Sequence, residues 1–180
     1  MTLQARGLVS ANGRQVRHIY SSGLSAGARV LTLTGEKPIE EIKAGERLVA
    51  ADIGIVRLRA ISKKRMHLRD MVRICPSALW DGDESDAFFV APNQPVVIRG
   101  WMARVMFGRD KALVSAQRLL DGKIFRTPRE HSLQEGTVTL FQLHFDKRHL
   151  VRVGGIDMTS TMLSALKPSK KETVGYWEDH

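Results

Sequence analysis

Gly23 to Leu48 read G-L-S-A-G-A-R-V-L-T-L-T-G-E-K-P-I-E-E-I-K-A-G-E-R-L, and this stretch decides the expected fold. Within it, residues 30–34 (V-L-T-L-T) alternate β-branched residues with leucine. A period of two predicts a half-buried strand. Residues 34–36 then form a turn. We expect a short compact loop to follow, held to the core by the apolar residues Ile39, Ile42 and Leu48 and closed by a turn at Gly45.

The opening of this stretch resembles the first block of the Hint domain, the autoprocessing module of hedgehog proteins and inteins. That block begins with Cys or Ser, then an apolar residue, two small residues, Gly or Asp, and a strand carrying Val and Thr. The residues in register are Leu24, Ser25, Ala26, Gly27 and Val30. The resemblance implies an all-β horseshoe of two pseudo-twofold-related β-subunits with many short strands and hairpins. It also implies a bacterial protein descended from self-cleaving modules.

Gly23 occupies the place of the nucleophile in this resemblance. Self-cleavage requires a side-chain sulfur or oxygen that attacks the preceding carbonyl and converts an amide into an ester or thioester. Glycine has no such atom. Ser22 and Ser25 are candidate substitutes, but on an extended segment Ser22 faces the opposite side and Ser25 lies about 6–7 Å further along. We expect both serines to be turn residues.

A second block supports the same resemblance. Residues 88–98 read as strand, turn, strand around a Pro-Asn-Gln-Pro corner. Processing Hint domains carry Thr or Ser, two variable residues and His at such a site, and the matching positions here are Ala91 and Gln94. Glutamine cannot titrate near neutral pH and cannot serve as a general acid. The resemblance therefore implies a pseudoenzyme whose family site positions are Gly23, Ala91 and Gln94, with no intact catalytic residue.

Later segments extend the resemblance to about Met158. An apolar-Arg-Gly-Trp segment stands at 97–101, and residues 139–146 alternate into a turn from which residues 150–153 return as the expected partner strand. An internal echo fits the duplication of a Hint domain. Ile39, Ile42, Gly45 and Leu48 share their three-residue spacing with Ala116, Leu119, Gly122 and Phe125. We expect a flexible basic arm at 1–22, a Hint-like β domain at 23–158 and a loose tail at 159–180.

Length and composition fit one compact domain of 180 residues with an ordinary hydrophobic content of 43%. No apolar run approaches the ~20 residues that cross a membrane, and no signal peptide is visible, so we expect a cytoplasmic protein, with leaderless export left open. The single cysteine, Cys75, is expected to be buried in a strand. No cofactor or metal is expected, because His144 and His149, the only pair that a hairpin could bring together, lack a third ligand.

Charge supports a rival interpretation. The net charge is +9 with a pI near 10.1, which permits weak nonspecific binding to polyanions. Aromatic residues are only 6% of the chain, so a stacking platform for nucleic acid is not expected. The basic residues gather in two stretches, Arg57 to Arg73 and Arg99 to Arg129, and an acidic loop holds Asp81, Asp83, Glu84 and Asp86.

These patterns favour a Hint-type protein that has lost self-cleavage and serves as a β-scaffold for binding or assembly, with an unidentified protein partner. A residually active autoprotease using Ser22 or Ser25 is the first alternative. A basic module for nucleic acid or an anionic surface is the second. The sequence leaves the oligomeric state open.

Overall fold

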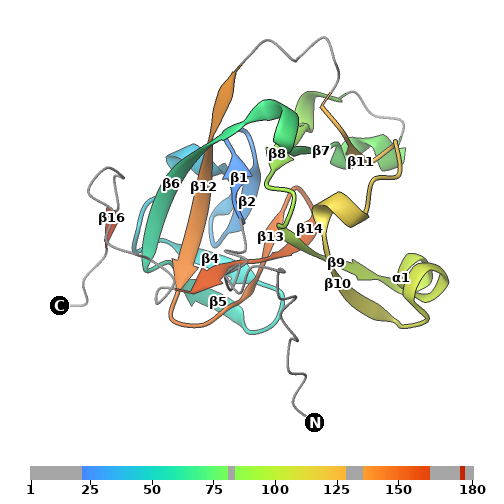
Figure 1. Cartoon of the computed structure of the whole chain (residues 1–180). Coiled ribbons are helices and arrows are strands. Elements are labelled where there is room, and N and C mark those ends of the chain that lie inside the picture. Colours follow the sequence, from blue (N-terminus) through green and yellow to red (C-terminus); the bar gives the residue numbers. More distant parts are fainter. Residues whose placement is uncertain (1–21, 81–83, 129–135, 163–174, 177–180) are drawn as a thin grey trace, which may run out of the picture.

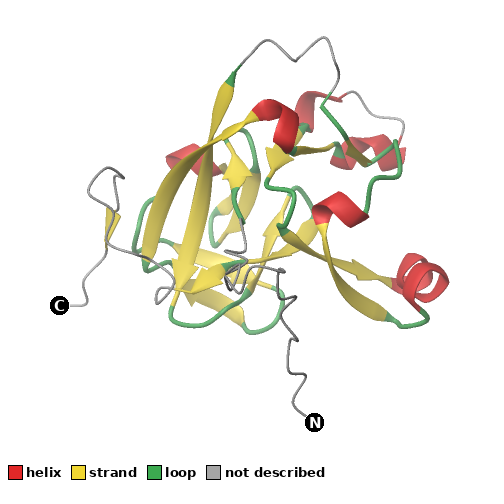
Figure 2. Cartoon of the chain, in the orientation of Figure 1, coloured by secondary structure: helices red, strands yellow, loops and turns green. Residues whose placement is uncertain are grey.

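The computed structural model describes residues 22–80, 84–128, 136–162 and 175–176. Within these ranges the protein is mostly β-structure, with one α-helix and several short 3₁₀ turns (Figure 2). The strands form two eight-stranded sheets that are antiparallel apart from one short pairing. The all-β prediction is confirmed.

The first sheet is built on two long strands, β6 and β12, that run side by side (Figure 1). Its strand order is β11-β7-β8-β1-β12-β6-β16, with β15 pairing parallel to β12. The bounds are β1 Leu24–Ser25, β6 Ala60–His67, β7 Val72–Ile74, β8 Phe88–Val90, β11 Phe125–Arg126, β12 Thr137–Phe145, β15 Thr161–Met162 and β16 Gly175–Tyr176.

The second sheet has the order β10-β9-β14-β13-β2-β4-β5, with β3 paired to β2. Its bounds are β2 Arg29–Thr32, β3 Gly35–Pro38, β4 Arg47–Ala50, β5 Gly54–Arg57, β9 Pro95–Arg99, β10 Lys111–Ser115, β13 Leu150–Val153 and β14 Ile156–Thr159. The expected strand at 30–34 is therefore shifted, because the tight turn into β3 already begins at Leu33. Val30 and Thr32 point inward as the alternation predicts, whereas Leu33 is exposed.

Helices are short in the described part of the chain. The α-helix α1, Gly100–Phe107, was not expected from sequence, and it ends at Gly108, whose left-handed backbone favours glycine. The 3₁₀ turns are η1 Ile39–Glu41, η2 Leu68–Asp70, η3 Pro76–Trp80, η4 Glu84–Asp86 and η5 Ala116–Arg118. Among the described residues, no helix combines the length and apolarity needed to cross a bilayer.

The sequence echo corresponds to a structural repeat. The amide of Ala28 donates to Ser25 O, and the amide of Gln94 donates to Ala91 O in the matching turn. In the first copy the Ile39 amide donates to Ala28 O as η1 begins. In the second copy the Ala116 amide donates to Gln94 O as η5 begins. Gln94 thus occupies the position in the second copy that Ala28 holds in the first. The hairpin of the second copy, β9 and β10, is longer because α1 is inserted between its two strands.

The expected hairpin between residues 138 and 153 is wrong. β12 pairs with β1, β6 and β15, whereas β13 pairs with β2, β4 and β14 in the other sheet. The intervening turn carries the chain from one sheet to the next. His144 and His149 are consequently not cross-strand neighbours: His149 Nδ1 contacts Asp52 Oδ2 at 3.0 Å, while His144 is buried among other partners.

Strand pairing continues past the boundary expected at Met158. β14 extends to Thr159, and β15 then pairs with the end of β12. Ser160, the residue between β14 and β15, is buried, and its hydroxyl accepts a hydrogen bond from the His149 amide. The β domain therefore includes at least part of the segment that we expected to be a loose tail.

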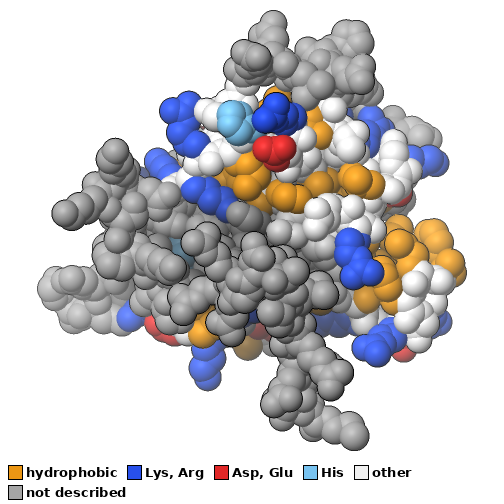
Figure 3. Space-filling view, in the orientation of Figure 1, with side chains coloured by type: hydrophobic (Ala, Val, Ile, Leu, Met, Phe, Trp, Pro, Cys, Tyr) orange, Lys and Arg blue, Asp and Glu red, His pale blue; other side chains and the backbone are white. Residues whose placement is uncertain are grey.

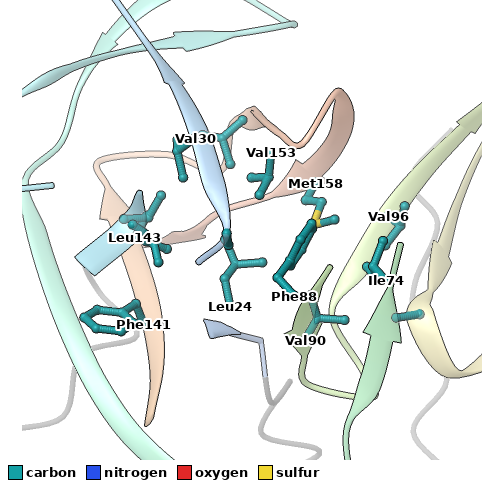
Figure 4. Close-up of a cluster of buried hydrophobic side chains, with 14 of the residues drawn as sticks. Leu24, Val30, Ile74, Phe88, Val90, Val96, Phe141, Leu143, Val153 and Met158 are labelled. Carbon is teal, nitrogen blue, oxygen red and sulfur yellow. The ribbon is translucent and has the colours of Figure 1, made fainter. Parts of the chain in front are cut away.

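A single main core joins the two sheets (Figure 4). Its members come from both copies of the repeat, including Leu24 and Val30 from the first and Phe88 and Val96 from the second. The three apolar residues that were expected to hold the loop after β3 to the core, Ile39, Ile42 and Leu48, are also buried. Burial of this apolar surface is the main force that holds β1 and β8 together at the centre of the molecule.

Candidate functional site

Gly23 and Gln94 meet at this centre. The Gly23 N–H donates to Gln94 Oε1 at 3.0 Å in a buried hydrogen bond. Gly23 is held just before β1, and its carbonyl accepts from the Ala91 amide at 3.0 Å. Gln94 closes the turn between β8 and β9. The 88–98 segment is thus strand, turn and strand, as expected.

Gln94 uses both ends of its amide. Its Nε2 donates to Thr159 O at 2.9 Å and to Pro95 O at 3.2 Å, while its Oε1 accepts from Gly23. The side chain is only 2% exposed. A buried polar group is stable only when its hydrogen bonds are made, and Gln94 meets this condition by joining three separate segments.

The other side of the Ser22–Gly23 peptide is held by Gln142 on β12. Gln142 Nε2 donates to the Ser22 carbonyl at 2.7 Å and contacts Ser22 Oγ at 3.2 Å. The peptide's N–H is therefore bound by one glutamine and its C=O by another. We call Gln94 and Gln142 together the peptide clamp. The clamp gives this peptide one acceptor and one donor, and neither glutamine can protonate its nitrogen near neutral pH.

The space around Gly23 is nearly full. A Cβ at this position would lie 3.0 Å from Leu140 Cβ and 3.3 Å from Leu140 Cδ1. The backbone φ of Gly23 is also +150°, a conformation that L side chains rarely adopt. The cavity beside it measures only about 10 Å³, roughly the room for one water. Beside Gly23 itself this cavity has no room for a group larger than a water.

The two serines proposed as substitutes have structural partners. Ser25 Oγ donates to Ala26 O at 3.0 Å and accepts from the Phe89 amide at 2.9 Å, which fastens β1 to β8. Ser22 Oγ lies 3.0 Å from Thr161 Oγ1 on β15. Ser22 also borders an open pocket of about 470 Å³. It is the more accessible to chemistry of the two, although its residue is only 8% exposed.

Behind the clamp lies a buried polar chain that the sequence did not predict. Ser62 Oγ on β6 lies 3.1 Å from Gln142 Oε1 and 2.7 Å from His144 Nε2. The Ser62 hydroxyl donates to Gln142 Oε1 and accepts from His144 Nε2 when Nε2 carries the imidazole proton; in the other tautomer Nε2 is an acceptor that competes with Gln142 Oε1 for the one hydroxyl proton. His144 Nδ1 contacts Met162 O at 3.3 Å. Burial lowers the pKa of His144, and the hydrogen bond to Met162 O opposes this effect only in part.

We expect His144 to make the fold less stable in mild acid. Because its pKa is lower in the folded than in the unfolded chain, protonation favours the unfolded state. The stabilisation is present above the unfolded value, near 6.5, and is lost as the pH falls below it. Urea unfolding across this range tests the effect. The slope contributed by this residue is at most about 1.4 kcal/mol per pH unit.

The matched variant is His144→Gln, which keeps an amide beside Ser62 but cannot titrate near neutral pH. The parent should lose more stability than His144→Gln on acidification, because all other histidines are common to both. Equal losses in the two proteins would contradict the assigned state of His144.

Gly23→Ala should destabilise the fold by about 1–3 kcal/mol, through backbone strain and crowding against Leu140. Gly27→Ala is the matched control, since its φ of +85° is also unfavourable but no atom lies within 4 Å of its Cβ position. Thermal unfolding should therefore show a larger loss at Gly23. A loss no greater than that of Gly27→Ala would refute the crowding.

The remaining sequence candidates divide clearly. Ala91 is fully buried and supports the clamp through its backbone. Cys75 is fully buried, as expected, but it lies just after β7, which ends at Ile74, and not in the strand. Within the described ranges no cluster of three potential metal ligands occurs. The acidic loop lies partly outside the described residues.

Sequence reasoning missed Gln142 and Ser62. A usable signal was the pair Gln142 and His144, polar residues two apart on one face of an apolar strand.

Comparison with known proteins identifies the family of the chain. A family model described as Hint domain matches residues 22–165, so the chain belongs to the Hint domain family. The solved structures that it resembles include a bacterial intein-like domain from Clostridium thermocellum, with 16% identity, a TM-score of 0.47, and coverage of 77% of this chain and 97% of that one.

A second similar structure is a splice-inactive variant of the AceL NrdHF class 3 split intein. The identity is 14% and the TM-score 0.45, with 78% of this chain and 97% of that chain covered. A search of curated proteins gives no match.

Proposed function

We propose that this Hint domain no longer cleaves its own chain and serves as a β-scaffold that holds its flanking segments in place. The observation that carries the proposal is the Ser22–Gly23 peptide. It has a glycine where the attacking atom is needed, and its N–H is bound by Gln94 rather than by a residue that can protonate it. The clamp stabilises an intact peptide.

The scaffold role is supported by the place where the two flanking segments leave the domain. Ser22 and Thr161 are in contact through their hydroxyls at 3.0 Å, although they are 139 residues apart in sequence. The chain before residue 22 and the chain after β15 therefore start from adjacent points, and residues 175–176 return from there to pair with β6. An uncleaved Hint body would keep the two segments together, and this is a useful property for assembly with a protein partner.

Residual self-cleavage through Ser22 or Ser25 is the competing function. The clamp disfavours it, because Gln94 and Gln142 act on the Ser22–Gly23 peptide, whereas attack by Ser22 would break the peptide before it. Attack by Ser25 would break the Leu24–Ser25 bond. Leu24 and Ser25 are both paired to β12, and Ser25 Oγ is occupied by two hydrogen bonds.

A protein with different tags at its two ends tests this proposal in cells. Both tags should remain on one chain throughout expression, and the Ser22→Ala and Ser25→Ala variants should behave like the parent. Separation of the tags in the parent, abolished by either substitution, would establish the autoprotease and contradict the scaffold.

A further inference from the structure

The arm formed by β9, α1 and β10, residues 95–115, carries large apolar side chains on its outer surface. Trp101 is 73% exposed, Val105 77% and Met106 50%. Trp101 and Val105 are four residues apart and share one face of α1. The opposite face is already used, since Ala103 is fully buried and Met102 and Phe107 pack against the core. The outer face of α1 therefore has no partner among the described residues.

Positive charge surrounds this face. Residues 99–111 contain four Lys or Arg and one Asp: Arg99, Arg104, Arg109, Lys111 and Asp110. Asp110 is paired with Arg104, so Arg109 and Lys111 dominate the field at the end of the arm. Figure 3 shows the apolar side chains gathered over α1 with Lys and Arg beside them. The base of the arm is fixed by Arg99, which bonds the buried Asp157 at 3.0 Å.

We propose that the outer face of α1 inserts into the interface of an anionic lipid bilayer. Trp with aliphatic side chains, bordered by Arg and Lys, is the composition that lies at the boundary of headgroups and acyl chains. The arm also projects from the body of the molecule (Figure 1). A projecting apolar tip can enter a deformable surface without any rearrangement of the two sheets.

The charges argue against the other occupants. A second copy would bring Arg109 and Lys111 against the same basic patch, and like charges repel across an interface. A polynucleotide would satisfy the cations but would leave Val105 and Met106 facing phosphates. Anionic lipid satisfies both features, because its headgroups neutralise the cations while its acyl chains take the apolar side chains.

Sedimentation with vesicles tests the proposal on the full chain. The parent should bind vesicles of equimolar phosphatidylcholine and phosphatidylglycerol, bind phosphatidylcholine alone much less, and be released by added salt. Trp101→Ser with Val105→Ser should weaken partitioning by at least about tenfold, since each removes apolar area from the lipid. Arg109→Gln with Lys111→Gln should weaken it by about tenfold or more.

The matched control is Ile53→Ser with Ile55→Ser. It removes two side chains of 58% and 55% exposure from the β4–β5 hairpin, at the other edge of the same sheet. This variant should bind like the parent. Three results would overturn the proposal. The first is no vesicle binding by the parent at low salt. The second is binding by the Trp101 and Val105 double variant that equals that of the parent. The third is a dimer of the parent that the Trp101 and Val105 double variant does not form. Retention on heparin without vesicle binding would show that the arm binds polyanions and not lipid.

Discussion

Gln94→Ala is expected to lower the free energy of unfolding by about 3 kcal/mol, a large effect for a single polar side chain. The change leaves the Gly23 N–H and the Thr159 carbonyl buried without their partner, and each unsatisfied group costs about 1–3 kcal/mol. For a domain of this size the unfolding temperature should fall by roughly 10 °C. Thermal and urea unfolding measure both quantities.

The matched control is Gln117→Ala, which removes the same amide group nearby. Gln117 is exposed and donates to Asn93 Oδ1 at 2.8 Å. Loss of an exposed hydrogen bond should change stability by less than about 0.5 kcal/mol. If both variants lost the same small amount, Gln94 would not be the structural element that we describe.

Gly23→Cys combined with Gln94→His is expected to produce self-cleavage after Ser22. The introduced thiol would attack the Ser22 carbonyl, the bond to the residue 23 nitrogen would break, and the introduced imidazole would protonate that nitrogen. Added thiol would then cleave the thioester. Gln142 Nε2, 2.7 Å from the Ser22 oxygen, already lies where negative charge would develop. Intact mass and fragment masses follow the reaction.

Gly23→Cys alone is the control, and it should cleave about a hundredfold to ten-thousandfold more slowly, because glutamine cannot protonate the leaving nitrogen. Both variants carry the same strain at residue 23. Leu140→Ala, added to each, removes the 3.3 Å contact with Cδ1 and leaves the 3.0 Å contact with Cβ equal in both. Equal cleavage with and without the Gln94 change would show that this position has no acid role.

Local patterns predicted the parts of the site that depend on nearby residues. The turn at 91–94 follows from Pro92 and Pro95 between two apolar strands, and it delivers Gln94 to the centre of the fold. Gly23 could be placed because the block that follows it has a distinctive order of small and β-branched residues. The echo between residues 39–48 and 116–125 is matched by equivalent 3₁₀ turns and glycines of positive φ.

Other features depend on tertiary pairing and were not predictable from local patterns. Alternation marks 150–153 as a strand but does not say which sheet receives it, and the expected hairpin with β12 was wrong for that reason. α1 was missed because apolar residues stand on both of its faces, so the helical period is weak. Gln142 reaches Ser22 only because β1 pairs with β12, a contact between residues 120 apart.

The most direct test of the central claim is the intact mass of the unmodified protein. Purified protein should be held for a day at neutral pH, alone, with a thiol and with hydroxylamine, since these nucleophiles capture any ester or thioester that forms at the clamp. We expect one species of unchanged mass under all three conditions. A fragment boundary at residue 22, 23 or 25 in any of them would contradict the claim that this Hint domain keeps its chain intact.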